Sequence, residues 1–179
     1  YVCIGDSLTN GPTRFFEVHA QMLLARYPQW TLQVRRWDDA ASSYLAPVTL
    51  QTGTGPRICT LFHASVAGTK AMHLCGDKLG PAISNVNPLD VIAVPIILIG
   101  QPPALASNAQ EPDVEAARSI ASLTGCGFID LHAQFWAAGR PASWYADSVH
   151  LTDPGSQQAA QMIDAHARVD HSLNPPITG

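Results

Sequence analysis

The chain has 179 residues and a mass of 19.1 kDa, the size of one domain with a complete hydrophobic core. Apolar residues make up 46% of it and charged residues only 13%, which excludes an intrinsically disordered chain. The net charge of −4 and the pI near 5.9 argue against a nucleic-acid-binding protein, whose phosphate contacts need a basic face.

Strands and helices are expected to alternate along the chain. Short aliphatic runs that end at turn residues predict buried strands, and apolar residues at helical spacing predict helices. In chain order we expect strand Tyr1–Ile4, helix Pro12–Tyr27, strand Thr31–Arg36, an excursion or loose hairpin over Ala40–Gly55, strand Arg57–Phe62, helix Gly68–Leu79, strands Val91–Val94 and Ile96–Ile99, helix Pro112–Thr124, strand Phe128–Leu131 and helix Pro154–Val169. This order predicts one α/β domain over residues 1–179, a three-layer α/β/α sandwich with a parallel, flavodoxin-like central sheet of about five strands.

One junction is too short for this architecture. Val91–Val94 and Ile96–Ile99 both have the character of core strands, yet only Pro95 separates them. Neighbouring parallel strands need a crossover of about a dozen residues or more. Either the two runs form one strand kinked at Pro95, or a segment is absent at this point, and we expect the absence. The combined apolar run, Val91–Ile99, is too short to span a bilayer.

The start of the chain and its cysteines leave the cellular compartment open. No signal-peptide pattern precedes the first strand, and because no initiator Met is present we expect the true start to be missing. The four cysteines form no metal-binding spacing. We interpret Cys3 and Cys59 as small buried hydrophobic residues, and a Cys75–Cys126 disulfide stays as an alternative to free thiols.

The first candidate for chemistry is the segment Gly5–Gly11, which reads Gly-Asp-Ser-Leu-Thr-Asn-Gly. It lies where the first strand ends and the first helix begins, and ligands of open α/β sheets bind at the carboxyl ends of the strands. Ser7 can there present its hydroxyl to a ligand and its N–H to an anion. The alternative is a plain turn and helix cap, because Asp, Ser, Asn and Gly are also what such a turn requires.

The second candidate is the pair Asp147 and His150, just before the last helix. A His that removes a proton from a nucleophile needs an acid on one ring nitrogen to fix its tautomer. Two residues at this spacing can make that hydrogen bond within one loop. The alternative is a turn-forming Asp followed by a surface His.

Ser7, with Asp147 and His150 far downstream, resembles the SGNH (GDSL) hydrolase family, whose first block is Gly-Asp-Ser-Leu and whose last block is Asp-x-x-His. Residues 64–69 resemble the second block of the family, and 125–131 the strand before the last block. Residues 150–155 resemble the junction into the last helix. The resemblance covers most of the chain and implies a serine ester hydrolase.

The resemblance also implies a role for each matching residue. Ser7 is expected to be the nucleophile, His150 the general base and then the acid, and Asp147 the residue that orients His150. The backbone N–H groups of Ser7 and Gly68 are expected to form the oxyanion hole, because glycine lets the backbone approach the substrate closely. The reaction is acyl transfer to water through an acyl-serine intermediate, and it requires no metal or organic cofactor.

Two departures from the family pattern stand out. The third block of the family, Gly-x-Asn-Asp, supplies an Asn to the oxyanion hole, and nothing in this sequence matches it. Its expected place coincides with the Val94–Pro95 junction, so an absent segment accounts for both observations. Gln101 is the substitute amide that we consider. His63 stands where the family often has Asn, and we expect it to pack or bond to the backbone rather than to act in catalysis.

Other side chains have less specific expectations. Trp144 and Tyr145 line the acyl or leaving-group side or else pack under the loop, and Tyr44 and Leu45 form a lip over the site. Arg35 and Arg36 are interpreted as a solvated strand edge. Helix faces or loops are expected to hold the remaining histidines, His19, His73, His132, His166 and His171.

The compact chain favours small acyl groups, acetyl above all, including acetyl esters of carbohydrates. We therefore expect a small-molecule or glycan ester as the partner, without nucleic acid and without a membrane span. One alternative is an SGNH-fold carbohydrate-binding or virion-type module that is catalytically weak or inactive. Another is a flavodoxin-like nucleotide binder that uses Gly5–Gly11 as an anion loop, disfavoured because this loop has no Lys to meet phosphate.

Overall fold

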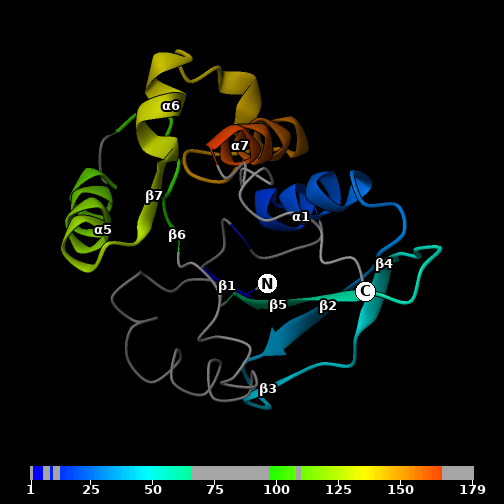
Figure 1. Cartoon of the computed structure of the whole chain (residues 1–179). Helices are drawn as coiled ribbons and strands as arrows, with labels where there is room; N and C mark the ends of the chain where they lie inside the picture. Colours follow the sequence, from blue (N-terminus) through cyan, green and yellow to red (C-terminus); the bar gives the residue numbers. More distant parts are fainter. Residues whose placement is uncertain (1, 6–8, 10–12, 66–96, 108–109, 167–179) are drawn as a thin grey trace.

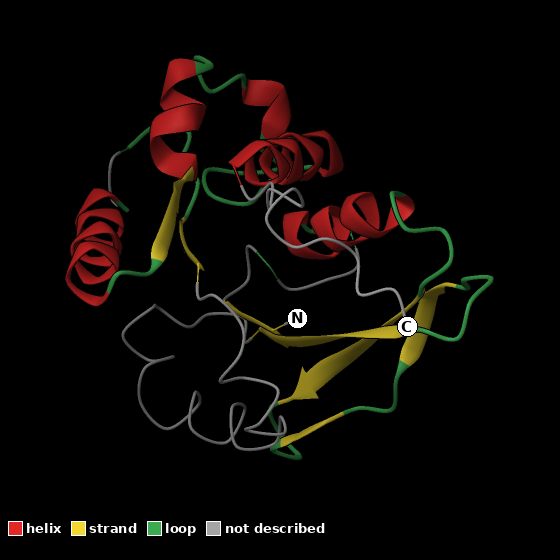
Figure 2. Ribbon diagram, viewed as in Figure 1, coloured by secondary structure: helices red, strands yellow, loops and turns green. Residues whose placement is uncertain are grey.

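A computed structural model describes residues 2–5, 9, 13–65, 97–107 and 110–166 of the chain. Strands and helices alternate through these ranges (Figures 1 and 2). In chain order they are β1 (Val2–Gly5), α1 (Phe15–Ala25), β2 (Thr31–Asp38), β3 (Ser43–Tyr44), β4 (Val48–Gln51), β5 (Ile58–Ser65), β6 (Ile97–Gly100), α5 (Glu111–Thr124), β7 (Gly127–Asp130), α6 (Leu131–Ala137), the short 3₁₀ helix η2 (Ala142–Trp144) and α7 (Asp153–His166). The chain therefore has the mixed α/β architecture that its sequence predicts.

Parallel strands form the centre of the larger sheet. β5 lies between β1 and β2 and runs parallel to both, with Gly5 opposite Ser65 and Thr31 opposite Ile58. β6 and β7 form a separate parallel pair in which Gly100 is opposite Asp130. The carboxyl ends of β1 and β5 consequently meet at one edge of the larger sheet, where the segments that follow them begin.

The strand order differs from the expected flavodoxin-like sheet. In that order the first strand lies between the second and the third, whereas β1 here pairs with β5 and β2 lies on the other side of β5. The segment after β2 also returns antiparallel, since both β3 and β4 pair with β2 in that direction. Connections this short can join only antiparallel neighbours, so the larger sheet is mixed rather than wholly parallel.

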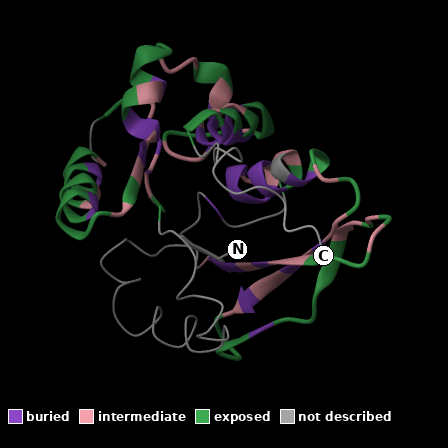
Figure 3. Ribbon diagram, in the orientation of Figure 1, coloured by how far each residue is buried: buried purple, intermediate pink, exposed green. Residues whose placement is uncertain are grey.

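The hydrophobic core lies between this sheet and two helices. α1 and α7 pack side by side over one face of the sheet (Figure 1). Their buried residues meet Leu32 and Val34 of β2 and Leu61 of β5, whose side chains are at most 1% exposed. Figure 3 shows these inward faces as buried and the outer faces of α5 and α7 as exposed. Burial of this apolar surface fixes α1 against the sheet.

Most expected elements are found within one to three residues of their predicted ends. Gly125 ends α5 in the left-handed conformation, with φ of 72°, as a C-terminal glycine is expected to do. The Thr152 side chain accepts a hydrogen bond from the Gly155 N–H at 3.2 Å and so caps α7. α6 and η2 were not predicted from the sequence. Leu131, which was expected to end a strand, is the first residue of α6.

Some expectations fall outside the described ranges, namely helix Gly68–Leu79, strand Val91–Val94 and the Val94–Pro95 junction. Cys126 carries a free thiol, so the alternative Cys75–Cys126 disulfide is not found. In the part of the chain that the structure describes, no helix has the length and hydropathy needed to cross a membrane.

Candidate active site

Asp147 and His150 form the hydrogen-bonded pair that their spacing predicts. The His150 ring nitrogen Nδ1 lies 2.7 Å from Asp147 Oδ2. The other carboxylate oxygen, Oδ1, accepts hydrogen bonds from the backbone N–H groups of Val149 and His150, each at 2.7 Å. The carboxylate is thus held by three bonds within one tight loop. An imidazole whose Nδ1 donates to a carboxylate has Nε2 as its basic nitrogen, which is the arrangement required of a general base.

The electrostatics of the pair keep Asp147 ionised. Hydrogen bonds from the backbone N–H groups of His150 and Val149, followed by the bond from the His150 ring, lower the pKa of Asp147 from 3.8 to about 2. Each bond stabilises the charged form, and the side chain is too exposed for burial to offset them. Asp147 therefore stays a carboxylate at neutral and at mildly acidic pH.

Neighbouring segments hold the loop that carries the pair. Tyr145 and Leu151 form an antiparallel bridge at its base, and the Ala146 N–H donates to the His150 carbonyl at 2.8 Å. The segment after β6 is also attached to it, because the Leu105 N–H donates to the Ser148 carbonyl at 2.9 Å. In addition the Tyr145 hydroxyl donates to the Pro103 carbonyl at 2.9 Å. The loop is consequently tied to the carboxyl end of β6.

The segment that follows β1 is linked to two other parts of the candidate site. Thr9, which is buried, shares a hydrogen bond of 2.7 Å between its Oγ1 and the Oγ of Ser65 at the end of β5. Arg14, just before α1, donates from Nη1 to the carbonyl of Leu151, the residue after His150. Ser7 and Gly68 themselves lie outside the described residues. Their described neighbours in the sequence, Gly5, Thr9 and Ser65, lie together at the carboxyl ends of β1 and β5.

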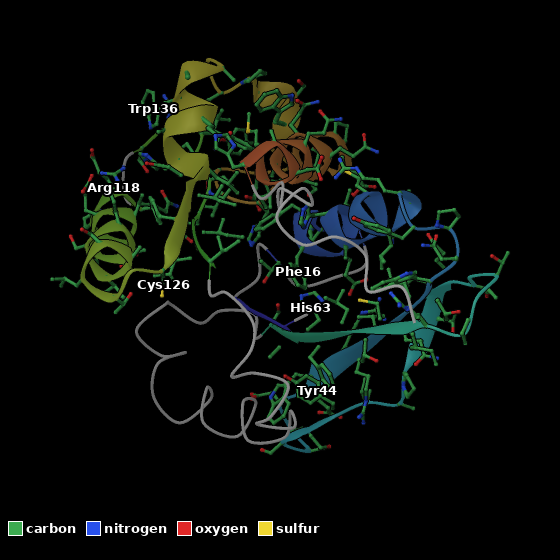
Figure 4. The ribbon with its side chains drawn as sticks, viewed as in Figure 1. Phe16, Tyr44, His63, Arg118, Cys126 and Trp136 are labelled. Atoms are coloured by element: carbon green, nitrogen blue, oxygen red, sulfur yellow. The ribbon has the colours of Figure 1, made fainter. Side chains whose placement is uncertain are left out.

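A buried charged cluster behind this edge was not predicted. Glu17 of α1 is fully buried, and both of its oxygens accept hydrogen bonds from Arg36 of β2, at 2.8 and 2.7 Å. His63 of β5 is 2% exposed, and its Nδ1 lies 2.8 Å from Glu17 Oε1. Its Nε2 has no hydrogen-bond partner among the described residues. Figure 4 shows His63 beside Phe16 between α1 and β5, with the two ring centroids 5.3 Å apart.

The cluster corrects two sequence interpretations. Arg36 is half-buried and ion-paired rather than part of a solvated strand edge. His63 packs against Phe16, as one of its two expected roles requires, but its hydrogen bond is to the Glu17 side chain rather than to the backbone. Burial raises the pKa of Glu17, but the hydrogen bonds from His63 and Arg36 outweigh it, so the pKa lies below the ordinary value of 4.5. Glu17 follows the same helical spacing as Ala20 and Leu24, and an acidic residue on that apolar stripe is the signal that sequence reasoning overlooked.

The remaining candidates have mainly packing roles. Trp144 is half-buried and meets the Phe135 ring edge-on at 5.2 Å, so it packs under the loop. Tyr44 is buried between Trp37 and Phe62, which corrects its assignment to a lip, while Leu45 beside it is exposed. Gln101 directly follows β6 and is half-buried.

The other histidines divide between buried and helix-end positions. His19 is 2% exposed and faces Asp164, so it belongs to the interior rather than to a helix surface. His132 is buried as well, and His166 bonds to the Met162 carbonyl at the end of α7. His73 and His171 lie outside the described residues. No group of three or more His, Cys, Asp or Glu in the described ranges is arranged to hold a metal ion.

Comparison with known proteins gives matches among solved structures alone, since no family model and no curated protein matches the chain. An acetyl xylan esterase, AlAXEase, matches with 16% identity and a TM-score of 0.53, over 93% of this chain and 98% of the esterase. A member of the lipolytic protein G-D-S-L family from Veillonella parvula DSM 2008 matches with 14% identity and a TM-score of 0.48, over 94% and 98% of the two chains. The likeness to the esterase is one of fold. The chain therefore shares its fold with an acetyl xylan esterase.

Proposed function

We propose that the protein is a serine ester hydrolase that acts through an acyl-serine intermediate. The observation that carries the proposal is the Asp147–His150 pair, whose 2.7 Å bond from Nδ1 leaves Nε2 as the base. The pair lies in the loop before the last helix, as the last block of an SGNH hydrolase requires. The proposal also holds that residues 1–179 form one domain and that this domain is a three-layer α/β/α sandwich.

The proposed reaction follows from the roles of three side chains. Ser7 Oγ attacks the ester carbonyl carbon while its proton moves to His150 Nε2, and Asp147 stabilises the imidazolium that forms. The N–H groups of Ser7 and Gly68 donate to the oxyanion of the tetrahedral intermediate. The intermediate expels the alcohol, which takes the proton from His150. Water then attacks the acyl-serine and gives a proton to His150, and His150 passes this proton to Ser7 Oγ as the acid is released.

Two observations support the choice of substrate class, the compactness of the chain and the identity of its fold neighbour. Short acyl esters, acetyl esters in particular, suit a compact domain, and an acetyl xylan esterase is a protein with this fold. We therefore propose acetyl esters, including O-acetyl groups on carbohydrate, as substrates. The partner is a small-molecule or glycan ester.

Hydrolysis of 4-nitrophenyl acetate tests the proposal, with acetate release from acetylated xylan as the second substrate. The parent protein should hydrolyse the acetyl ester in preference to the octanoyl ester, and Ser7→Ala should reduce the rate to the uncatalysed background. Parent and Ser7→Ala proteins with equal rates would contradict a serine nucleophile.

A second candidate function rests on one sequence observation, the missing Gly-x-Asn-Asp block. Loss of one oxyanion donor costs an enzyme about 10²- to 10³-fold in turnover. A folded protein that hydrolyses no ester but binds acetylated xylan would be a carbohydrate-binding module instead. In an active protein, Gln101→Ala tests whether the missing donor has a substitute. A tenfold or larger loss of turnover would identify the Gln101 amide as that donor.

A further inference from the structure

Thr9 lies two residues and Arg14 seven residues after the proposed nucleophile, and each bonds to a part of the site that is distant in the sequence. We infer that Thr9 and Arg14 are positioning residues, which fix the segment that contains Ser7 relative to the oxyanion loop and to the His150 loop. This inference rests on the proposed function. Neither side chain is proposed to touch the substrate. Their proposed role is to keep Ser7, Gly68 and His150 at the spacing that reaction at one carbonyl requires.

Thr9 bonds to the end of β5, which precedes the proposed oxyanion residue Gly68 in the sequence. Its hydroxyl shares a 2.7 Å hydrogen bond with Ser65, and Ser65 is the last residue of β5, three positions before Gly68. The backbone supports the same connection, since Gly5 and Ser65 are opposite each other in the parallel register of β1 and β5. Thr9 is 8% exposed, so water competes weakly for its hydroxyl. Thr9, two residues after Ser7, and Ser65, three residues before Gly68, are thus joined by a short, partly buried bond.

Arg14, just before α1, bonds to the loop that carries the proposed base. Its guanidinium donates to the Leu151 carbonyl, and Leu151 is 1% exposed and directly follows His150. Leu151 also forms the base of the His150 loop through its bridge with Tyr145. A charged donor on a buried carbonyl makes a stronger bond than a neutral donor does. Movement of the His150 loop away from the segment before α1 would break it.

The proposed reaction is sensitive to the positions that the Thr9–Ser65 and Arg14–Leu151 bonds hold. Proton transfer from Ser7 to His150 requires a heavy-atom distance within about 2.6–3.2 Å, and oxyanion donors act at about 2.7–3.1 Å. A displacement of about 1 Å can cost about 100-fold in rate. Loss of either link should therefore lower kcat and leave KM nearly unchanged, because neither side chain is assigned to substrate binding.

Steady-state kinetics with 4-nitrophenyl acetate tests the inference through single and paired substitutions. Thr9→Val and Ser65→Ala should each lower kcat about tenfold with KM within about twofold, and Thr9→Ser, which keeps the hydroxyl, should retain parental kcat. Arg14→Met should lower kcat by a similar factor. The double variant T9V/S65A should lose no more than either single variant, because both remove one bond, whereas T9V/R14M should lose the product of the two effects.

Matched controls separate positioning from general destabilisation. Thr31→Val removes another partly buried hydroxyl, which accepts from the Gly53 N–H at 3.0 Å, and Arg35→Met removes another guanidinium bonded to backbone carbonyls, those of Tyr44 and Leu45. Both controls should keep kcat within about twofold. Parental kcat in folded T9V, S65A and R14M, or multiplied losses in T9V/S65A, would overturn the inference while leaving the proposed function intact. An inactive parent would overturn both.

Discussion

At the scale of single residues, the Asp147 carboxylate controls the state of the proposed base. Asp147→Asn keeps the size of the side chain but cannot hold the imidazolium, and its amide can present a donor to Nδ1. By analogy with serine hydrolase triads we expect kcat for 4-nitrophenyl acetate to fall by about 10³- to 10⁴-fold. Ser148→Ala is the matched control, since Ser148 lies in the same loop and is exposed. Equal activity of the Asp147→Asn and Ser148→Ala variants would remove Asp147 from the mechanism.

The charge of Asp147 has its own test in pH titration by NMR. Because three hydrogen bonds hold its pKa at about 2, the carboxylate should show no titration between pH 4 and 8. The chemical shift of the labelled carboxyl carbon should stay constant over this range and change only in stronger acid. A midpoint near the ordinary value of 3.8 would mean that the loop does not hold the carboxylate in solution.

At the scale of elements, the contact between α7 and η2 holds the His150 loop from below. Gly155 in the first turn of α7 faces Trp144, and a Cβ at this position would lie 2.1 Å from the Trp144 carbonyl oxygen. Gly155→Ala must therefore separate the two helices, and we expect it to reduce the free energy of unfolding by about 3 kcal/mol, at the upper end of overpacking effects.

Urea denaturation checks this expectation against Gly125→Ala. Gly125 has φ of 72°, and a Cβ there meets no atom within 4 Å. Its substitution costs only the strain of the left-handed conformation, about 1 kcal/mol. A loss for Gly155→Ala no larger than that for Gly125→Ala would mean that α7 and η2 are not in close contact.

The same scale shows which elements the sequence could predict. β5, α1 and α5 could be predicted because their signals are local: the spacing of their apolar residues and, for α5, the glycine that follows it. The order of β1, β5 and β2 depends on contacts between distant segments, which periodicity does not encode. The short helix α6 was missed because its start is fixed by a cap, the Asp130 side chain that accepts from the Ala133 N–H, in a run that looks like the end of a strand.

The candidate site follows the same division. Asp147 and His150 could be paired from the sequence because a spacing of three allows the bond within one loop. The links from Thr9 to Ser65 and from Arg14 to Leu151 span 56 and 137 positions and could not be foreseen from spacing. The Glu17 cluster, which joins three elements, was likewise visible only as an acidic residue on an apolar stripe.

At the scale of the whole molecule, the Glu17 cluster joins α1 to the sheet. Glu17→Gln removes a fully buried charge that pairs with Arg36 and His63, and breaking a buried pair in this way should cost about 3 kcal/mol in the free energy of unfolding. Glu115→Gln is the control, because Glu115 pairs with Arg118 at an exposed position and should cost less than about 1 kcal/mol. Similar losses in the two variants would mean that the cluster does not hold α1.

The cluster also predicts how stability depends on pH. The pKa of Glu17 in the folded protein is below its ordinary value of 4.5, so the folded state binds this proton less readily than the unfolded state. The stabilisation is therefore complete above pH 4.5 and is lost as the pH falls through the lower folded pKa. Urea denaturation of the parent and Glu17→Gln should give a difference that is constant above pH 5 and shrinks below 4.5. A difference in the free energy of unfolding that grows on acidification would contradict a lowered pKa of Glu17 in the folded protein.

The central claim, an activated serine at position 7, is tested most directly by intact-mass spectrometry after exposure to a fluorophosphonate. We predict one adduct on the parent protein, none on Ser7→Ala, and slower formation on Asp147→Asn, because the reagent reacts with a serine whose proton a neighbouring base removes. A folded parent protein without an adduct, or an adduct that persists in Ser7→Ala, would contradict the claim.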